Sequence, residues 1–255
     1  MAATTKTVAF FGASTGVGLS ALKHALAGGC RCVALCRNPA KLTALLPPET
    51  TPNLEIVQGN AHDPAAVSRC LRRQGTEAEG GGLVDTVVFS IGGRFIASKM
   101  TLDDPHVCER GMEVLIKAIA ELRRELGGGK KPHIVVCSTT GISSHGRDTA
   151  LAILPVYALL KVPHADKRAM EDKLVEAGRG DRADYTYTII RPTVLVDGET
   201  DKDVRIGIED PVAGIRESMT LGYTISREDT GKWVARNLVL KMNPAYMRKA
   251  VVVTY

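Results

Sequence analysis

Short runs of apolar, β-favouring residues alternate along the chain with segments of helical periodicity. The first run, residues 7–11, is followed by Leu19, Leu22 and Leu26, whose spacing of three and four predicts one face of a helix. The alternation predicts strands at residues 7–11, 32–36, 54–57, 84–89, 133–137, 185–190 and 251–253. Right-handed crossovers place helices on both faces of such a sheet. We therefore predict an α/β fold built on one doubly wound parallel sheet of about seven strands.

Residues 193–226 interrupt this rhythm, because they are rich in glycine and charged residues. We expect them to form a small lid that covers a substrate at the carboxyl ends of the strands. The remaining pattern is continuous, so a single domain over residues 1–255 is predicted.

No segment has the pattern of a membrane anchor or a secretion signal. The longest nearly apolar run, residues 151–160, contains Pro155 and is about half as long as the roughly 20 residues that a membrane span requires. The N-terminus lacks a basic segment followed by an apolar stretch and a cleavage site. We expect a cytoplasmic protein without a membrane partner.

The net charge of +5 is unevenly distributed. Residues 1–48 contain five Lys or Arg and no Asp or Glu, whereas the remaining chain has equal numbers of both signs. Only 4% of the residues are aromatic, so the basic surface with interleaved aromatic side chains that is typical of nucleic-acid binding is missing. We expect a small phosphorylated ligand near the N-terminal residues and no nucleic-acid partner.

The six cysteines form no CxxC pair and have no metal-type spacing. Several lie within apolar runs, where a free thiol behaves as a small hydrophobic group. We predict reduced, buried cysteines and no metal site.

A glycine-rich loop, GASTGVG at residues 12–18, follows the first predicted strand and opens the first predicted helix. In this context a dinucleotide fingerprint is informative. Gly12 permits the tight turn, Gly16 lets the backbone approach a pyrophosphate, and Gly18 lets the helix pack against the strand. The loop N–H groups and the helix dipole then face the anion. We predict a Rossmann-type dinucleotide site that also includes Ser14, Thr15 and Val17.

The residue at the end of the second predicted strand decides which dinucleotide is favoured. A site for NAD usually has Asp or Glu here to bind the ribose 2′-hydroxyl, but this chain has Arg37. A guanidinium suits a 2′-phosphate, and Lys41 follows one helical turn later. Because no carboxylate precedes Glu49, we predict NADP(H) as the cofactor.

With these residues in place, the chain resembles the short-chain dehydrogenase/reductase superfamily, nearest its atypical NAD(P)H-binding, NmrA-like branch. The resemblance extends over nearly the whole chain. It rests on the glycine loop, RNPAKL at 37–42, Ser138-Thr139 at a strand end, IRPT at 190–193 and ISRED at 225–229. In this order and at these distances the motifs indicate the fold and the cofactor more strongly than the reaction.

The resemblance also implies further cofactor contacts at the carboxyl ends of the strands, where open α/β sheets bind ligands. Residues after the third strand are expected near the adenine, those after the fourth near the nicotinamide ribose, and the IRPT motif beside the nicotinamide. The residues so implied are Asn60, Ala61, Ser90, Ile91, Gly92, Pro192 and Thr193.

In catalytic relatives, a Tyr and a Lys four residues apart on one helix act on the substrate oxygen. Tyr157 and Lys161 have this spacing, but Pro163 falls where their helix should continue, and an internal proline costs about 3 kcal/mol. Alternatively, the helix begins at Pro163, since proline is tolerated in a first turn, and Lys167 is the family lysine. Both registrations remain open. In the second, Pro163 occupies the position of the family tyrosine, so the usual catalytic acid is missing.

The resemblance thus implies Lys167, Ser138, Thr139 and Tyr157 as candidate catalytic residues, with Lys167 also contacting the cofactor. We predict an NADPH-dependent oxidoreductase that acts on a small organic substrate by hydride transfer. A non-enzymatic NADP(H)-sensing regulatory protein and a non-redox isomerase or cyclase are the alternatives. The amphipathic helix expected at residues 105–126 packs either in the core or against a second subunit, so a homodimer stays open.

Overall fold

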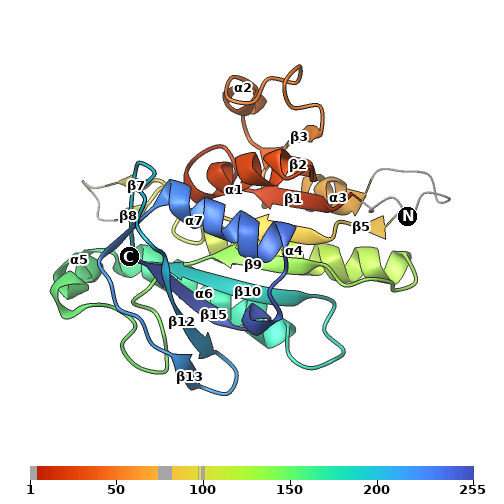
Figure 1. Ribbon diagram of the computed structural model, residues 1–255. Helices are drawn as coiled ribbons and strands as arrows, with labels where there is room; N and C mark the ends of the chain where they lie inside the picture. The colour runs from red at the N-terminus through yellow and green to blue at the C-terminus, as the bar shows by residue number, and fades with distance from the viewer. Residues whose placement is uncertain (1–4, 74–81, 97, 99–100) are drawn as a thin grey trace.

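A computed structural model describes residues 5–73, 82–96, 98 and 101–255. Seven strands run parallel: β1 (Thr7–Phe11), β2 (Arg31–Cys36), β3 (Leu54–Gln58), β6 (Thr86–Phe89), β9 (His133–Cys137), β10 (Thr186–Pro192) and β15 (Ala250–Thr254). Two further strands, β12 (Arg205–Asp210) and β13 (Ile215–Ser218), complete the sheet. The order is β13-β12-β15-β10-β9-β6-β1-β2-β3 (Figure 1). The predicted doubly wound parallel sheet is confirmed.

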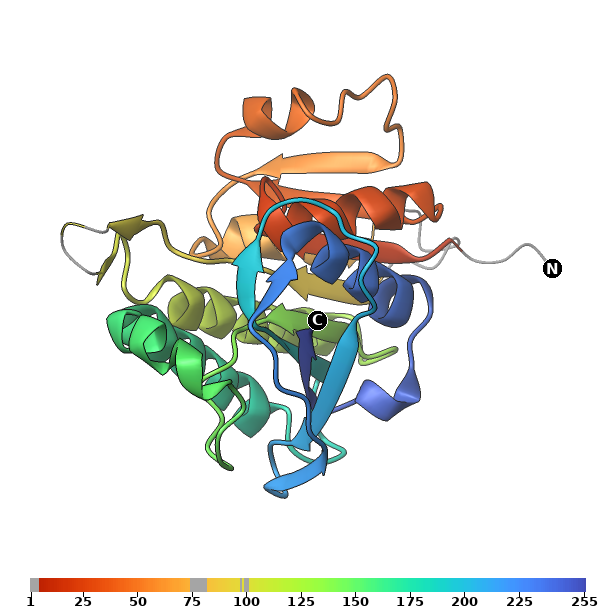
Figure 2. The ribbon, with the colours of Figure 1, turned by 60° about the vertical axis from the view of Figure 1, so that its left-hand side comes forward.

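Helices cover both faces of this sheet (Figure 2). One face is covered by α1 (Gly16–Ala27) and α7 (Arg227–Val234), and the other by α3 (Pro64–Leu71), α4 (Val107–Glu125) and α6 (Lys161–Ala177). Alternate residues of β1 pack against the helices on the two faces of the sheet, because successive side chains of a strand point to opposite faces. Val8 and Phe10 pack in the core under α1, whereas Ala9 and Phe11 pack in the core under α4. The apolar face of α4 therefore packs within the chain.

The remaining helices and strands are short and lie outside the main sheet and its covering helices. They are α2 (Pro39–Thr43), α5 (Leu154–Leu159), the 3₁₀ turns Leu151–Ile153 and Pro244–Tyr246, the π-helical turn Ala235–Leu240, β4 (Arg72–Arg73), β5 (Gly82–Leu83), β7 (Phe95–Ile96), β8 (Thr101–Leu102), β11 (Val194–Val196) and β14 (Thr224–Ser226). Asp63 caps α3, since its side chain accepts a hydrogen bond of 3.0 Å from the N–H of Ala65.

The segment 193–226 differs from its prediction as a lid. Its middle part extends the sheet by two antiparallel strands: β12 pairs with β15, and β13 pairs with β12 at the edge of the sheet. Only its two ends, β11 and β14, form a separate two-stranded ribbon. The sequence did not predict β12 and β13 as strands, because their residues, RIGIED and IRES, form no continuous apolar run.

All six cysteines are free thiols and five are buried, which confirms the prediction for them. Within the described ranges, no three His, Cys, Asp or Glu side chains lie close enough to hold a metal ion. In the same part of the chain, no helix combines the length and apolarity needed to cross a membrane.

His133, in β9, is buried with both ring nitrogens hydrogen-bonded to hydroxyls. Nδ1 lies 2.8 Å from Thr186 Oγ1 and Nε2 lies 3.1 Å from Thr188 Oγ1. Because the Thr188 hydroxyl donates its hydrogen to the carbonyl of Tyr246, it accepts from Nε2–H, and Nδ1 accepts from Thr186. Burial, with a smaller effect of the positive charge of Lys6, lowers the pKa of His133 from 6.5 to about 3.

Acidification should therefore destabilise the protein through His133. Below pH 6.5 the unfolded chain binds a proton here that the folded chain binds only near pH 3, so the free energy of unfolding falls as the pH falls through this window. In His133→Asn this pH dependence should be shallower by up to about 1.4 kcal/mol per pH unit. Urea unfolding at a series of pH values measures it. The exposed His145 provides the control His145→Asn, and equal slopes in both variants would contradict the assignment.

Candidate cofactor and active site

A cleft of about 470 Å³ opens at the carboxyl ends of the parallel strands. Open α/β sheets bind ligands at this position. The loops that follow β1, β2, β3, β6 and β9 line the cleft, together with one side chain of α6. The predicted site residues among its lining are Gly12, Ser14, Thr15, Gly16, Val17, Arg37, Asn60, Ala61, Ser90, Ile91, Gly92, Ser138 and Lys167.

The glycine loop leaves no room for side chains at two positions. Gly12 has a φ of +90°, and a Cβ there would lie 2.7 Å from the carbonyl carbon of Ser90. A Cβ at Gly18 would lie 2.2 Å from Ser90 Oγ and 2.5 Å from the Gly12 carbonyl oxygen. Gly18 therefore lies outside the lining and supports the loop from beneath, because it lets α1 pack closely.

Ser90 fixes the loop rather than presenting a free hydroxyl to a ligand. Its Oγ lies 3.2 Å from the carbonyl oxygen of Phe11 and 3.1 Å from that of Gly12. The hydroxyl hydrogen is thus used within the chain. Ser90 borders the cleft as predicted, and its side chain positions the end of β1.

Arg37 and Lys41 occupy different places. Arg37 directly follows β2, is exposed and lines the cleft. Lys41, on α2, is exposed but is not among the lining residues. Among the described residues, no carboxylate forms an ion pair with either side chain. An unpaired guanidinium at this edge of the cleft suits an anionic group.

The break between α5 and α6 decides between the two helix registrations that the sequence left open. Tyr157 lies in α5, whereas Lys161 is the exposed first residue of α6. Pro163 lies in the first turn of α6, where proline is tolerated. The interpretation that placed Tyr157 and Lys161 on one helix is wrong, and Lys167 is the lysine that faces the cleft.

Lys167 is held by two main-chain carbonyls at neighbouring strand ends. Its Nζ donates to the Ile91 oxygen at 2.8 Å and to the Cys137 oxygen at 2.7 Å. An ammonium group has three N–H donors, and these two carbonyls accept two of them. Burial opposes the charge, but the pKa of Lys167 is raised by the nearby Cys108 and Cys137 thiols and the Asp166 carboxylate.

Ser138 presents a hydroxyl that the chain leaves without a partner. It follows β9, lines the cleft and is 5% exposed, and no described residue hydrogen-bonds to its Oγ. A buried polar atom without a partner costs about 1–3 kcal/mol. The position therefore suits a ligand that supplies the missing hydrogen bond.

Tyr157 and Thr139 lie outside the residues that line the cleft. Tyr157 is buried, and its hydroxyl lies 2.7 Å from Thr140 Oγ1. Burial raises the pKa of Tyr157 above its ordinary value. The Thr139 hydroxyl donates to the Thr140 carbonyl at 3.2 Å. Of the four predicted catalytic residues, Ser138 and Lys167 line the cleft, whereas Thr139 and Tyr157 do not.

Pro192 and Thr193 tie β10 to its neighbours. The Pro192 carbonyl accepts from the N–H of Thr140 at 3.1 Å, and Thr193 Oγ1 lies 3.0 Å from Thr254 Oγ1. Neither residue is among the lining of the cleft. Their expected contact with the nicotinamide therefore stays a prediction.

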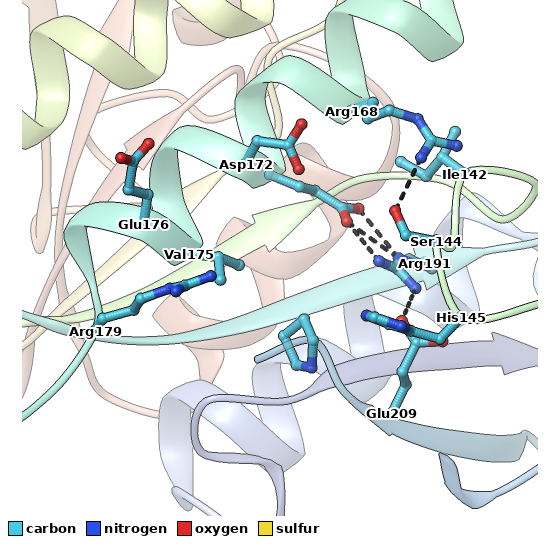
Figure 3. Close-up of a pocket in the computed structure, with 12 residues that line it drawn as sticks. Ile142, Ser144, His145, Arg168, Asp172, Val175, Glu176, Arg179, Arg191 and Glu209 are labelled. Atoms are coloured by element: carbon cyan, nitrogen blue, oxygen red, sulfur yellow. Dashed lines mark hydrogen bonds and ion pairs between the residues drawn. The ribbon is translucent and has the colours of Figure 1, made fainter. Parts of the chain in front are cut away.

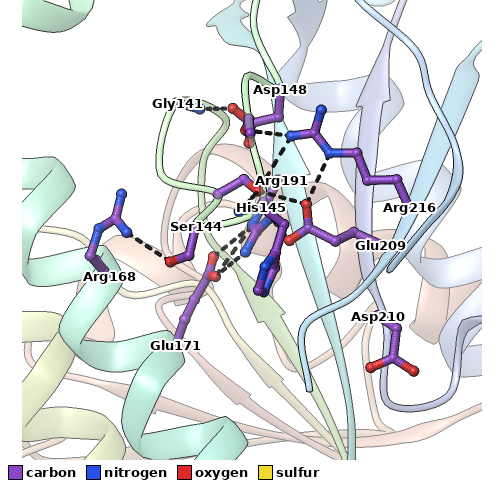
Figure 4. Close-up of polar contacts among 12 residues, drawn as sticks. Gly141, Ser144, His145, Asp148, Arg168, Glu171, Arg191, Glu209, Asp210 and Arg216 are labelled. Atoms are coloured by element: carbon purple, nitrogen blue, oxygen red, sulfur yellow. Dashed lines mark hydrogen bonds and ion pairs between the residues drawn. The ribbon is translucent and has the colours of Figure 1, made fainter. Parts of the chain in front are cut away.

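Arg191, in the same motif, is the centre of a buried ion-pair network. Its guanidinium lies 2.6 Å from Glu171 Oε2 and 2.8 Å from Glu209 Oε1, and only 4% of its side chain is exposed. Figure 4 shows Glu171 of α6 and Glu209 of β12 approaching Arg191 from two sides. Burial opposes the charge, but both carboxylates raise the pKa of Arg191. Because Glu171 is one turn from Lys167, the network fixes the helix that carries Lys167 into the cleft.

A second cavity, about 340 Å³ in volume, lies beside this network between α6 and the loop after β9 (Figure 3). It shares none of its described lining residues with the cleft. Its lining mixes both signs of charge: Arg168, Glu171, Asp172, Glu176, Arg179, Arg191 and Glu209. Such a lining selects no single class of ligand.

Eight lining residues of the cleft were not predicted from the sequence. Five of them lie within two positions of predicted site residues along the chain: Leu35, Cys36, Gly59, Gly93 and Cys137. The other three are Val107, Leu195 and Arg227. Val107 is the first residue of α4, Leu195 lies in β11 and Arg227 is the first residue of α7. Arg227 belongs to the ISRED motif, and this motif was the one sequence signal that could have placed it at the site. The other two come from distant elements that only the fold brings together.

Three comparisons place these observations among known proteins. A family model described as NAD(P)H-binding matches residues 12–239. The chain is 41% identical to "Reductase pytE" of Aspergillus terreus over the whole of both chains. It is 32% identical to "Oxidase pynE" of Aspergillus niger, over 97% of this chain and 98% of that protein.

Solved structures share the fold at low identity. A short-chain dehydrogenase/reductase of Veillonella parvula in complex with NADP has a TM-score of 0.68 and 14% identity, covering 98% of this chain and 94% of that one. The anaerobilin reductase ChuY of Escherichia coli O157:H7 has a TM-score of 0.61 and 17% identity, covering 98% and 97%.

Proposed function

Because the chain belongs to the NAD(P)H-binding family whose model matches residues 12–239, we propose that it is an NADPH-dependent reductase of a small organic substrate. The relatives named reductase and oxidase support an oxidoreductase, and the family match supports a nicotinamide cofactor. The preference for NADPH rests on one observation: Arg37 lines the cleft, and no carboxylate in the described part of the chain forms an ion pair with its guanidinium.

The residues of the cleft fit a dinucleotide. The loop of residues 12–18 forms a cradle in which a Cβ at Gly12 or Gly18 would collide with backbone or Ser90, so main-chain N–H groups can approach a pyrophosphate. At the other end, the hydroxyl of Ser138 has no hydrogen-bond partner among the described residues. Arg37 lies where a ribose 2′-phosphate requires a cation.

Lys167 would hold the nicotinamide ribose with its third N–H, since its other two donors are used by Ile91 and Cys137. When bound, the reduced nicotinamide supplies hydride to a substrate carbon. Ser138 then donates a hydrogen bond to the substrate oxygen and stabilises the charge that develops on it. Because the Tyr157 hydroxyl is engaged with Thr140 outside the cleft, the proton comes from solvent or from the substrate itself.

The ends of the segment 193–226 would enclose the substrate. Leu195 of β11 lines the cleft, and β11 is paired with β14 beside it. An apolar side chain at this point suits an apolar substrate. The lid role therefore belongs to this ribbon and not to β12 and β13.

Ser138→Ala tests this assignment. We expect kcat/KM for NADPH-dependent turnover to fall about 10- to 100-fold, because a preorganised donor to the substrate oxygen is lost. The melting temperature should stay the same or rise, because the variant removes a buried hydroxyl without a partner. Turnover is followed by NADPH absorbance with a panel of small apolar carbonyl compounds.

Ser144→Ala is the matched control, since Ser144 is exposed and lines the second cavity in the same loop. Ser138→Thr, which keeps the hydroxyl, should retain most of the activity. Unchanged kcat/KM in Ser138→Ala would remove Ser138 from the site. A wild-type protein that consumes no NADPH with any compound of the panel would count against the reductase.

A further inference from the structure

Arg227 lies against the glycine loop, at Gly16. Its side chain lines the cleft and is 34% exposed. Its Cδ lies 3.4 Å from the point where Gly16 would carry a Cβ, so the aliphatic stem packs on the loop itself. The guanidinium Nη1 donates to Asp197 Oδ1 at 2.7 Å.

We propose, on the basis of the proposed function, that Arg227 binds the pyrophosphate of the dinucleotide and that Asp197 occupies its guanidinium until the cofactor binds. Arg227 is thus a second cation of the cofactor site, distinct from Arg37. Asp197 is a competing internal anion, because one guanidinium face cannot pair closely with a carboxylate and a phosphate at once.

The geometry favours the pyrophosphate over the 2′-phosphate as the partner of Arg227. Gly16 begins α1, and a bound pyrophosphate lies at that helix N-terminus in dinucleotide sites. Arg37 occupies the other phosphate position after β2. Arginine presents paired N–H donors that match phosphate oxygens, and such charge-assisted hydrogen bonds are about twice as strong as neutral ones.

The ion pair with Asp197 is easily exchanged. Asp197 is 86% exposed, and exposed ion pairs contribute little because water screens them. It is also a carboxylate that pairs with a lining residue of the cleft, whereas residues 1–48, which contribute the glycine loop and Arg37 to that lining, contain none. In this proposal the Asp197 carboxylate pairs with Arg227 only until a phosphate binds there.

The turn after β11 stays in place when this contact is lost. Three other contacts attach it to α7: Gly198 N–H donates to Glu228 Oε2 at 3.1 Å, Thr200 N–H donates to Asp229 Oδ2 at 3.1 Å, and Glu199 pairs with Lys232. None of these residues lines the cleft. The exchange thus involves two side chains and leaves the fold of the turn intact.

Calorimetric titrations of Arg227→Gln and Asp197→Asn with NADPH and with NADH test the proposal. Arg227→Gln should raise both dissociation constants about tenfold or more, because both cofactors carry the pyrophosphate. Asp197→Asn should lower both by about two- to fivefold, because the competing carboxylate is gone. In the double variant, Asp197→Asn should have no effect, since its target guanidinium is absent.

Glu199→Gln is the matched control, because it makes the same charge change in the same turn but breaks the ion pair with Lys232, away from the cleft. It should leave both constants unchanged. Arg227→Lys should lie between the wild type and Arg227→Gln, and melting curves without cofactor should coincide for all variants, because the exchanged pair is exposed.

The outcomes separate this inference from the proposed function. A wild type that binds neither cofactor would overturn the proposed function and this inference with it. A wild type that binds NADPH, with Arg227→Gln binding equally well, would overturn only the role of Arg227. If Asp197→Asn lowers the dissociation constants equally in the presence and absence of Arg227, Asp197 acts by repelling the cofactor directly. This result would overturn the proposed competition between Asp197 and the pyrophosphate for Arg227.

Discussion

Replacing Arg37 with glutamate is expected to reverse the cofactor preference. NADPH should lose the guanidinium that pairs with its 2′-phosphate and meet a repelling carboxylate, while NADH gains an acceptor for its ribose 2′-hydroxyl. The ratio of the dissociation constants for NADPH and NADH should rise by about two to three powers of ten, on the order of 3–4 kcal/mol. Isothermal titration with both cofactors measures this ratio.

Arg37→Gln should give an intermediate ratio, because it removes the attraction without adding repulsion. Lys23→Glu serves as the charge control, since Lys23 is exposed on α1 and does not line the cleft. It should leave the ratio unchanged. An equal loss of NADPH and NADH affinity in Arg37→Glu would show that Arg37 does not recognise the 2′-phosphate.

Glu171→Ala should destabilise the protein by about 3 kcal/mol. Glu171 and Arg191 are both buried and 2.6 Å apart, and removing one partner of a buried ion pair leaves the other charge poorly compensated. Glu209 still neutralises part of that charge at 2.8 Å, which limits the loss. Chemical denaturation at neutral pH measures the change in the free energy of unfolding.

The same variant should weaken NADPH binding, because Glu171 and Lys167 share one turn of α6. Glu171→Gln keeps the side-chain volume and should lose less stability, since no cavity forms. Glu176→Ala is the control on the exposed face of the same helix and should change stability by less than about 0.5 kcal/mol. A loss in Glu171→Ala no larger than in this control would contradict the role of the network.

The parallel sheet could be predicted because its signals are local. Six of its seven strands are runs of β-favouring residues that are almost entirely buried, as expected for a sheet covered on both faces. The seventh, β3, lies at the edge of the sheet and is only partly buried. The strand β12 has a different pattern: its buried residues are Gly207 and Glu209, while Ile206 and Ile208 are only partly buried. Glu209 is buried because it pairs with Arg191, and hydrophobic periodicity contains no sign of such a pair.

The cofactor half of the site could be predicted for the same reason. The glycine loop and Arg37 lie within 30 residues of each other and belong to one strand–helix–strand unit. The catalytic half depends on the break at Leu160, where α5 ends and α6 begins. It also depends on the carbonyls of Ile91 and Cys137, which hold Lys167. Main-chain acceptors are the same for every residue type, so no sequence pattern reveals them.

The most direct test of the central proposal is a calorimetric titration of the wild-type protein with NADPH and then with NADH. The proposal predicts clear binding of NADPH and a dissociation constant about tenfold or more higher for NADH, a difference on the order of 1.4 kcal/mol. Equal affinity for both would contradict the role of Arg37. Binding of neither would contradict the dinucleotide site itself.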